Sequence, residues 1–462
     1  MKLQAAFMVP HPPLIVKEVG KGSEKEVIKT IKSYEAIAEE IKEIEPDTII
    51  ITSPHSIIYN DYFHISSSKK EGEGDFSNFN AKEICFEENF DYDLIEKINQ
   101  IAEKEQFPAG ILGETDRNLD HGCMVPLYFI RKKYQNYKLV VIGLSNLPLS
   151  EHYHLGMIIQ KAIEQSNKKV VIIASGDLSH KLQSYGPYGY ADEGPIYDQK
   201  IMEIMGKGEF QELLEFKEDF LEKAAECGHR SFTIMAGALD ELEADIKEYS
   251  HEDITGVGYG ICSYHRLRKN KNRDFLTKYL EKEKNNIYNQ IKNEDSYISL
   301  ARKTIENYIN NNQALTLPNK LEKDMYNKKA GVFVSIHKMN NLRGCMGTFL
   351  PTTNCIGEEI ISNAILAATK DPRFNPIKKE ELPYLEIKVD ILNTPEYIES
   401  IDELDPKKYG VIVSNKEKRG LLLPNLDGID TVEEQLDIAR KKANIADNEP
   451  VEIQRFCVER HE

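Results

Sequence analysis

Four histidines in the first half of the chain adjoin short apolar runs, where folding could bring them to one site. His11 follows AAFMVP, His55 follows IIITSP, His180 follows IIASGDLS, and His121 lies in LDHGCMVPL. Imidazole binds divalent metals and exchanges protons near neutral pH. Glu226, in AAECGHRSF, adds a carboxylate. Two imidazoles and a carboxylate form the facial ligand set of ferrous sites that activate oxygen, and the remaining histidines would then supply acid–base chemistry.

Each of these residues also has a purely structural interpretation. A single histidine after a strand is more often a loop or surface residue. Asp177 and Ser179 could cap the turn that precedes His180, and Glu226 could lie on a solvated helix. Four such histidines are not expected to converge in one crevice by accident. The pattern therefore favours a shared site.

The segment after Glu226 leaves the ligand set open. Cys227 and His229 follow it, so three potential ligands lie within four residues. A thiolate ligand would favour softer metals and redox chemistry over activation of dioxygen. Cys123, two residues after His121, adds a second thiol. The alternative is that both cysteines are small buried apolar residues, as free cysteines usually are.

Strand-like and helical segments alternate around these residues. β-Branched apolar runs predict buried strands at Leu3–Val9, Thr48–Thr52, Lys138–Leu144 and Val170–Ser175. Helical patterns are found at Glu24–Ile44, Pro126–Tyr134 and Gly156–Ser166. This alternation predicts an α/β domain with a mostly buried central sheet flanked by helices. In such sheets ligand groups collect just past the strand ends, which is where the histidines are expected.

The composition changes between Arg266 and about Ser296, where the chain is charged and rich in asparagine. We therefore predict a first domain at 1–267, a charged helix or linker at 268–294, and a second domain at 295–462. The second domain has an α+β pattern. Its helices are expected at Tyr297–Asn311 and Gly357–Thr369, its strands at Gly331–Ile336 and Leu385–Leu392, and a hairpin at Gly410–Ser414 with Leu421–Leu423.

The overall composition excludes several classes of protein. The 462 residues include 59 Lys+Arg and 76 Asp+Glu, and the net charge of −17 would repel nucleic acids and anionic membranes. The apolar runs are too short to span a membrane. Seven dispersed cysteines without a CxxC pair argue against a disulfide framework and predict a cytoplasmic protein. The oligomeric state stays open.

The second half contains its own candidate site, in LRGCMGTF at 342–349. Its glycines predict a tight turn that displays Arg343 and Cys345. Arg343, Arg373 and Arg419 lie in turn-rich segments and could bind a carboxylate or phosphate. Cys345 near an arginine could act as a nucleophile or redox thiol. The alternative is that the glycines are structural and Cys345 is packed, and a binding surface is favoured over catalysis.

Six motifs of the first half together resemble the class III extradiol ring-cleavage dioxygenases of the LigB-like type, whose fold the Memo family shares. They are MVPHPP, TSPHS, DHGCMVPL, ASGDLSH, DEGPIYDQKI and AECGHRSF, over roughly residues 4–265. The resemblance implies Fe(II) held by His11, His55 and Glu226, with Zn(II) or another divalent metal as alternatives. It implies an acid–base role for His180 and a role in holding substrate or dioxygen for His121. Cys227 is the alternative ligand, because the Memo branch places a cysteine close to this site.

The second half resembles the AMMECR family, through LRGCMG, ATKDPRFNP, LEIKVDIL and KRGLLLPNLDG over roughly 295–460. Met346 stands where isoleucine is more usual. The order of the two domains resembles the bacterial and archaeal family called AmmeMemoRadiSam system protein A. That resemblance implies two partners, a Memo-like protein and a radical SAM enzyme. The chain itself has no CxxxCxxC cluster motif.

Three functional hypotheses follow. The first is a metal-dependent ring-cleavage dioxygenase or related oxidoreductase, acting on a small catechol-like or other chelating aromatic substrate. The second is a non-oxidative metal-dependent lyase or hydrolase at the same site, with His180 as base. The third is a non-catalytic metal-binding partner of a radical SAM enzyme. The identity of the substrate depends on loop shapes that the sequence does not reveal.

Overall fold

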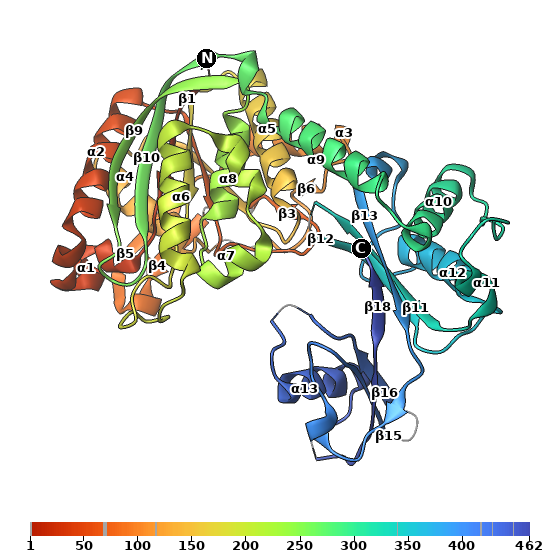
Figure 1. Ribbon diagram of the computed structural model, residues 1–462. Coiled ribbons are helices and arrows are strands. Elements are labelled where there is room, and N and C mark those ends of the chain that lie inside the picture. Colours follow the sequence, from red (N-terminus) through yellow and green to blue (C-terminus); the bar gives the residue numbers. More distant parts are fainter. Residues whose placement is uncertain are drawn as a thin grey trace. The chain divides into compact units, whose positions relative to one another are not determined.

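A computed structural model describes residues 2–67, 72–115, 118–339, 341–415, 418–426, 428–446 and 448–462. The chain divides into two compact units, Met1–Leu280 and Glu281–Glu462. Their boundary lies within α9 (Phe275–Ile291), a helix that occupies most of the charged segment 268–294 (Figure 1).

A six-stranded mixed sheet forms the centre of the N-terminal unit, in the order β7–β2–β8–β1–β10–β9. Its strands are β1 (Leu3–Val9), β2 (Thr48–Ser53), β7 (Lys138–Gly143), β8 (Val170–Ser175), β9 (Leu242–Glu252) and β10 (Tyr259–Lys269). The first four run parallel, and β10 and β9 continue the sheet in antiparallel fashion. The parallel strands are almost entirely buried, as β-branched runs covered on both faces should be.

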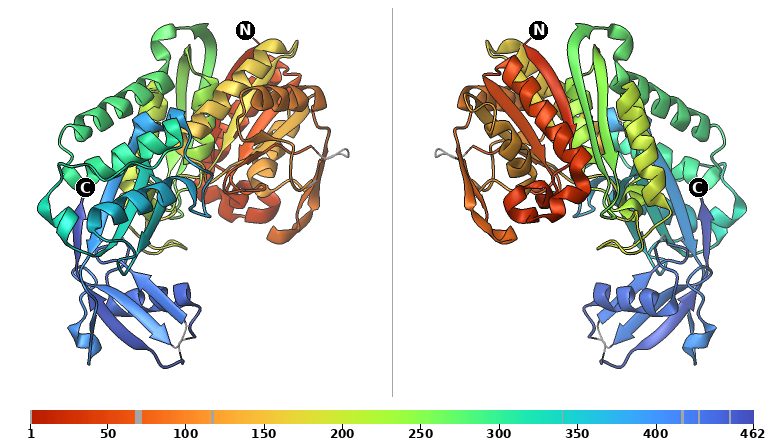
Figure 2. Two further views of the ribbon diagram at one scale, coloured as in Figure 1. Left: turned by 90° about the vertical axis from the view of Figure 1, so that its right-hand side faces the viewer. Right: turned by 90° about the vertical axis from the view of Figure 1, so that its left-hand side faces the viewer.

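Helices cover both faces of this sheet (Figures 1 and 2). One face is covered by α2 (Ile28–Ile44) and α4 (His121–Arg131), the other by α5 (Leu149–Gln165), α6 (Glu193–Lys207) and α8 (His229–Ala238). The predicted α/β class is therefore confirmed. The strands β9 and β10 were not predicted; β9 is an edge strand whose sequence, LEADIKEYSHE, has few apolar residues.

Other helices and strands belong to the N-terminal unit. They are α1 (Lys17–Gly20), α3 (Tyr92–Lys104), α7 (Glu218–Ala224), the parallel pair β3 (Phe63–His64) and β6 (Ala109–Gly110), and the antiparallel hairpin of β4 (Gly72–Phe76) and β5 (Ala81–Glu88). Main-chain bridging between Glu73 and Asn118 connects this hairpin to the segment that leads into α4.

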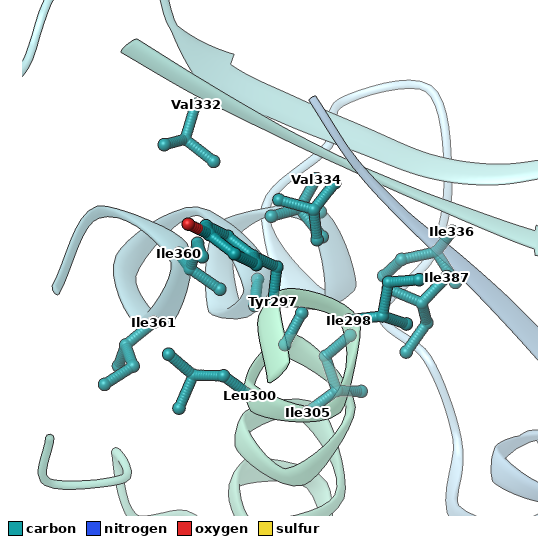
Figure 3. Close-up of a cluster of buried hydrophobic side chains, with 14 of the residues drawn as sticks. Tyr297, Ile298, Leu300, Ile305, Val332, Val334, Ile336, Ile360, Ile361 and Ile387 are labelled. Carbon is teal, nitrogen blue, oxygen red and sulfur yellow. The ribbon is translucent and has the colours of Figure 1, made fainter. Parts of the chain in front are cut away.

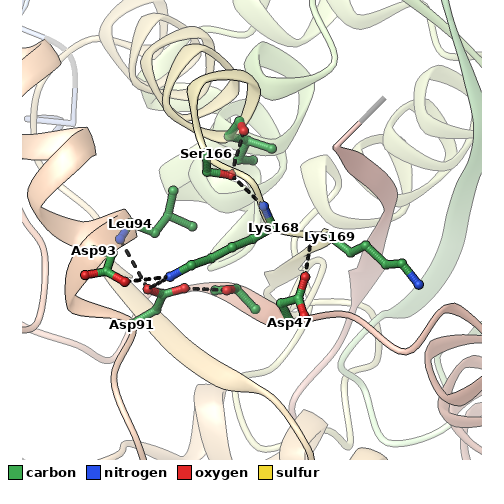
Figure 4. A network of polar contacts seen from close by, with 9 residues as sticks. Asp47, Asp91, Asp93, Leu94, Ser166, Lys168 and Lys169 are labelled. Carbon is green, nitrogen blue, oxygen red and sulfur yellow. Dashed lines mark hydrogen bonds and ion pairs between the residues drawn. The ribbon is translucent and has the colours of Figure 1, made fainter.

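A polar network secures the amino ends of two central strands (Figure 4). Lys168, which precedes β8, forms an ion pair with the fully buried Asp91 and lies 3.3 Å from Asp93 Oδ2. Asp47, which precedes β2, accepts the Lys169 N–H at 2.7 Å. Asp91 also accepts the Leu94 N–H at 3.2 Å and so caps α3. These contacts anchor one end of the sheet, and the chemistry-bearing residues follow the other end.

The C-terminal unit contains two four-stranded sheets, in the orders β12–β11–β13–β18 and β14–β17–β15–β16. The strands are β11 (Gly331–Lys338), β12 (Asn341–Thr348), β13 (Leu385–Leu392), β14 (Glu396–Tyr397), β15 (Gly410–Asn415), β16 (Lys418–Leu422), β17 (Glu452–Phe456) and β18 (Val458–His461). The helices are α10 (Ser296–Asn311), α11 (Lys323–Asn327), α12 (Ile356–Thr369) and α13 (Val432–Ala443). The predicted α+β class is confirmed.

The core of this unit lies between the first sheet and two helices (Figure 3). Ile298 and Ile305 of α10, Ile360 of α12 and Val334 of β11 are at most 3% exposed. Burying a side chain of this kind contributes about 1.5–3 kcal/mol relative to leaving it exposed. This packing holds β12, which carries LRGCMG, against α12.

The structure corrects the prediction of a turn at LRGCMG. Residues Asn341–Thr348 form strand β12, paired with β11 along its length, so Arg343 and Cys345 lie on a strand. A side chain at Gly344 would place its Cβ 2.3 Å from the carbonyl oxygen of Ala367 in α12. This glycine is therefore needed for close approach of helix and strand, and the sequence pattern alone does not distinguish that use from a turn. Arg419 likewise lies on a strand, β16.

Candidate metal centre

Three imidazoles meet at the carboxyl edge of the parallel strands. His11 follows β1 and His55 follows β2, while His121 is the first residue of α4. His11 Nε2 lies 3.0 Å from His55 Nε2, and the ring centroids of His55 and His121 are 3.9 Å apart. One donor atom from each of the three lies within 4.8 Å of the others. Because parallel strands end at the same edge of a sheet, His11 and His55 converge here although they are 44 positions apart in the chain. The start of α4 brings His121, a further 66 positions along, to the same place.

The orientation of His11 is set by a chain of two hydrogen bonds. Ser175 Oγ donates its proton to the Gly122 carbonyl at 2.6 Å. It can then only accept from His11 Nδ1, which lies 3.0 Å away. His11 Nδ1 therefore carries the ring hydrogen, and Nε2 has its lone pair available toward His55. The His11 backbone N–H also donates to Asp177 Oδ1 at 2.7 Å.

Burial keeps these imidazoles neutral. It lowers the pKa of His11 well below its usual value, and the neighbouring His55 and His121 lower it further. Burial lowers the pKa of His121 to about 4, with a further contribution from His55. Burial also lowers the pKa of His55, although the nearby Asp120 acts in the opposite direction. Neutral imidazole is the form that binds a metal, so these donors fit a divalent cation.

A second set of donors also includes His11. Cys227 Sγ is 3.6 Å from His11 Nε2 and accepts the Asp177 N–H at 3.2 Å. His11, Asp177 and Cys227 can also bring donor atoms within 4.8 Å of one another. A Cβ at Gly176 would lie 2.1 Å from Gly228 Cα, so only glycine lets the loop with Cys227 approach the end of β8 this closely. Burial raises the pKa of Asp177 to about 7.

Glu226 uses its carboxylate to cap a helix. Its Oε2 accepts the His229 N–H at 2.6 Å, at the beginning of α8. Burial raises the pKa of Glu226 to about 7. Among the described residues, Glu226 is in neither group of donors that converge within 4.8 Å, so its role as a ligand stays a prediction. His229 is buried, with Nε2 2.9 Å from the Leu213 carbonyl oxygen.

His180 lies near the imidazole cluster and contributes to the lowered pKa values of His11 and His55. Its Nδ1 hydrogen-bonds to the Ala225 carbonyl, which can only accept, so Nε2 is the basic nitrogen of the neutral ring. Burial lowers the pKa of His180. The ring also contacts Tyr188 edge to face, with centroids 5.1 Å apart.

A cleft of about 690 Å³ opens beside His55 and His121. Phe79, Phe86 and Met124 line its apolar part. The Phe79 ring lies edge-on to His121 at a centroid distance of 5.4 Å. Cys123 is fully buried in α4, with Sγ 3.8 Å from Asp120 Oδ2. Sequence reasoning missed this cleft, because the hairpin that forms its wall has no catalytic motif.

Two residues that position the site were also missed as such. Asp120 accepts the Ser53 hydroxyl at 2.6 Å and the Cys123 N–H at 3.2 Å, which joins the end of β2 to the start of α4. Ser175 orients His11. The sequence does carry a signal for Asp120, because aspartate is a preferred capping residue and Asp120 directly precedes the first residue of α4.

The candidate residues of the C-terminal unit form two separate ion pairs. Arg343 Nε and Nη2 each lie 2.9 Å from a Glu381 carboxylate oxygen. Arg373 pairs with Asp371 through Nε at 3.0 Å and Nη2 at 2.7 Å. Asp371 Oδ2 also accepts the Cys345 N–H at 2.9 Å. Cys345 Sγ accepts from Ser335 Oγ at 3.2 Å. Both guanidinium groups thus already have carboxylate partners.

Comparison with known families decides the classification. A family model described as the catalytic LigB subunit of aromatic ring-opening dioxygenase matches residues 5–262, more than half of the chain. The chain belongs to the LigB family. The AMMECR1 model matches residues 298–461, so this LigB protein carries an AMMECR1 domain in its second half. Both resemblances inferred from the motifs are thereby confirmed.

Relatives of this LigB protein match either the whole chain or part of it. A protein of Clostridium acetobutylicum is 42% identical over 100% of this chain and 99% of its own length. A protein of Thermotoga maritima is 48% identical over 36% of this chain and 98% of its own. The crystal structure of an uncharacterized protein from Pyrococcus horikoshii shares 31% identity, with a TM-score of 0.34 over 36% of this chain and 88% of that one. Among the described helices of this LigB protein, none is long and apolar enough to cross a membrane.

Proposed function

We propose that the N-terminal unit is a metal-dependent oxidoreductase that acts on a small catechol-like or other chelating aromatic substrate. The observation that carries this proposal is the convergence of three neutral imidazoles at the strand ends, one with its Nε2 lone pair directed into the cluster, beside a cleft of small-molecule size. Membership of a family described by aromatic ring opening supports the same chemistry.

The residues present fit a divalent metal. His11 and His55 would hold it, and His121, Glu226 or Cys227 would complete the ligand set. Fe(II) is the favoured ion, with Zn(II) or another divalent metal as the alternative. When bound, Fe(II) supplies the one-electron chemistry that dioxygen needs to react with an aromatic ring.

The chain itself supplies positioning and proton transfer. His180 donates through Nδ1 to the Ala225 carbonyl, so its Nε2 can accept the proton of a substrate hydroxyl and later return it. Because burial lowers the pKa of His180, the ring begins the reaction as a base. Phe79 and Phe86 offer an apolar surface to an aromatic ring in the cleft.

Elemental analysis of protein purified without oxygen tests the proposal. We expect near-stoichiometric iron in the wild type, and its loss in His11→Ala. Glu226→Ala and Cys227→Ala distinguish the two candidate ligands, because only the variant that lacks a true ligand should lose metal. Catechols are then tested with and without dioxygen. Iron that is bound but supports no oxygen-dependent ring opening would contradict the oxidoreductase proposal.

One observation favours a second candidate. The Cys227 sulfur lies 3.6 Å from His11 Nε2 and would give the site a softer donor, suited to Zn(II). A non-oxidative lyase or hydrolase would then use His180 as base. Stoichiometric zinc that disappears in Cys227→Ala would support this function. If the wild type is active and His180→Ala is equally active, both enzyme proposals are contradicted. The remaining hypothesis is then the non-catalytic metal-binding partner.

The fusion of the two domains supports a proposal about partners. We infer that this chain works as component A of an AmmeMemoRadiSam system, with a Memo-like protein and a radical SAM enzyme, and that the AMMECR1 domain docks them or presents substrate. Size-exclusion chromatography of the purified chain with each partner tests this. Separate elution at micromolar concentrations would contradict a stable complex.

A further inference from the structure

A buried carboxylate on α6 belongs to a motif that the proposed chemistry leaves unused. Asp198, in the segment DEGPIYDQKI, is 2% exposed. Aspartate is almost never fully buried unless it is paired. Its Oδ2 lies 2.7 Å from His251 Nε2 of β9, and its Oδ1 accepts the Ser179 N–H at 2.9 Å. The carboxylate therefore joins an edge strand of the sheet to the loop that leads from β8 to His180.

The backbone of Ser179 is held at both its N–H and its carbonyl. The N–H donates to Asp198, and the carbonyl accepts the Gly258 N–H at 2.8 Å. The Gly258 carbonyl in turn accepts the Leu178 N–H at 2.8 Å. A Cβ at Gly258 would lie 2.0 Å from Asp198 Oδ2, so only glycine lets the carboxylate come this close to the start of β10. The surroundings of Asp198 thus fit its carboxylate in one place.

Ser179 passes this constraint to His180, the next residue. The Ser179 hydroxyl donates to the Ala224 carbonyl at 2.7 Å, and His180 Nδ1 donates to the Ala225 carbonyl. Two consecutive side chains thus bond to two consecutive carbonyls at the end of α7. A shift of the Ser179 backbone would disturb both hydrogen bonds, because both side chains leave the same short stretch of main chain. The tautomer of His180 depends on the second of these bonds.

The pair of Asp198 and His251 also has an electrostatic effect. Burial lowers the pKa of His180, whereas the Ala225 carbonyl and the Asp198 carboxylate act in the opposite direction. The hydrogen bond with Asp198 raises the pKa of His251, and the charges of Asp253 and Glu248 add to this effect. Burial raises the pKa of Asp198, and the hydrogen bond from His251 opposes that rise. Each partner therefore favours the charged form of the other.

We propose that Asp198 is a positioning residue for His180, and that His251 holds the Asp198 carboxylate in place. Through the Ser179 N–H, Asp198 fixes the loop from which His180 Nδ1 donates to Ala225, and this bond keeps Nε2 as the basic nitrogen. The inference deepens the proposed function and rests on it where His180 acts as a base. The tautomer of His180, by contrast, can be measured without any reaction.

NMR of the full-length protein labelled with ¹⁵N-histidine tests the tautomer directly. The shifts of the two ring nitrogens distinguish the Nδ1–H form from the Nε2–H form, and the signal that disappears in His180→Asn belongs to His180. At mildly alkaline pH, in the presence of the diamagnetic Zn(II), we expect the Nδ1–H form in the wild type and its loss in Asp198→Ala. An Nε2–H form in the wild type, or an unchanged tautomer in Asp198→Ala, would overturn the inference.

Matched variants separate the hydrogen bond from the bulk of the side chain. Asp198→Asn keeps an oxygen that can accept the Ser179 N–H, so it should restore the wild-type tautomer. Asp192→Ala is the control, because Asp192 is an exposed residue of the same motif whose side chain forms no capping hydrogen bond with α6. If Asp198→Asn behaves like Asp198→Ala, or if the control also loses the tautomer, the anchoring role of Asp198 is contradicted.

Steady-state kinetics with catechol and dioxygen measures the consequence for the proposed reaction. We expect Asp198→Ala to lower kcat by about 10–100-fold while KM and metal content stay within about twofold, because a misplaced catalytic group slows the reaction rather than binding. Asp198→Asn should recover most of the lost rate. A raised KM at unchanged kcat, or loss of metal from Asp198→Ala, would contradict positioning of the base.

His251→Ala keeps the inference falsifiable if Asp198→Ala does not fold, since the His251 side chain is 34% exposed on an edge strand. This variant should lower both kcat and the share of the Nδ1–H form of His180. His251→Gln, which can still donate to Asp198, should recover both. Unchanged values in His251→Ala would overturn the role of the pair. If the wild type does not turn over catechol, the proposed oxidoreductase fails, and the tautomer of His180 in these variants still decides whether Asp198 positions it.

Discussion

His11 Nε2 lies 3.0 Å from His55 Nε2, although the two residues belong to different strand ends and His11 is only 2% exposed. Because His11 Nδ1 donates to Ser175, His11 Nε2 carries a lone pair, which can accept a hydrogen bond from His55 or bind a cation between the rings. The pair is therefore preorganised, and binding a metal requires little movement of the backbone.

Metal binding should stabilise the N-terminal unit by mass action. At a free metal concentration of one hundred times the dissociation constant, the free energy of unfolding rises by about 2.7 kcal/mol. We expect removal of metal by a chelator to lower the temperature of the corresponding unfolding transition by several degrees. His11→Ala should abolish this shift when the two are compared by scanning calorimetry. A shift of the same size in His11→Ala would mean that the metal binds elsewhere.

Ser175→Ala should weaken metal binding without removing a ligand. The variant leaves His11 Nδ1 without its acceptor and frees the ring to adopt the other tautomer. Loss of such a supporting hydrogen bond typically costs about 10–100-fold in metal affinity, which competition with a chelator can measure. Ser166→Ala is a suitable control, because the Ser166 hydroxyl bonds within its own turn to the Ile163 carbonyl. Unchanged affinity in Ser175→Ala would refute the tautomer argument.

His180→Asn separates catalysis from metal binding. The asparagine side chain can still donate to the Ala225 carbonyl, but it cannot act as a base. We expect unchanged metal content and a fall in the turnover rate of about 10²–10⁴-fold, the usual contribution of a general base. Parallel loss of metal and activity would instead identify His180 as part of the ligand set.

Acid stability of the C-terminal unit should depend on Asp371. Its hydrogen bond with Arg373 lowers the pKa of Asp371 from 3.8 to about 2. A carboxyl whose pKa is depressed on folding stabilises the protein above its unfolded pKa, and this contribution is lost as the pH falls from about 4 to 2. Asp371→Asn should therefore be more destabilising at pH 6 than at pH 2.5, as measured by denaturant unfolding. An equal effect at both pH values would exclude an ionic contribution.

Gly344→Ala tests the close packing of β12 on α12. The added Cβ would lie 2.3 Å from the Ala367 carbonyl oxygen, so helix and strand must separate. Overpacking of this kind costs about 1–3 kcal/mol. Denaturant unfolding followed by circular dichroism measures the change. A substitution tolerated without loss of stability would contradict the close contact.

Local sequence was sufficient for most of the sheet. The runs Leu3–Val9 and Val170–Ser175 form strands with the predicted bounds, and Thr48–Thr52 extends by one residue. These runs are apolar and β-branched, and neighbouring residues alone favour the strand conformation. Because the strands are parallel, the sequence also predicted that His11 and His55 would lie at one edge.

Tertiary structure decided which side chains meet there. The Glu226 carboxylate accepts the backbone N–H of His229, whereas His121 lies with His11 and His55 and the Cys227 sulfur approaches His11 Nε2. Periodicity describes how a residue relates to its immediate neighbours, but these contacts join residues as many as 216 positions apart. Their geometry depends on the packing of loops and on single hydrogen bonds such as that from His11 to Ser175, and neither leaves a pattern in the sequence.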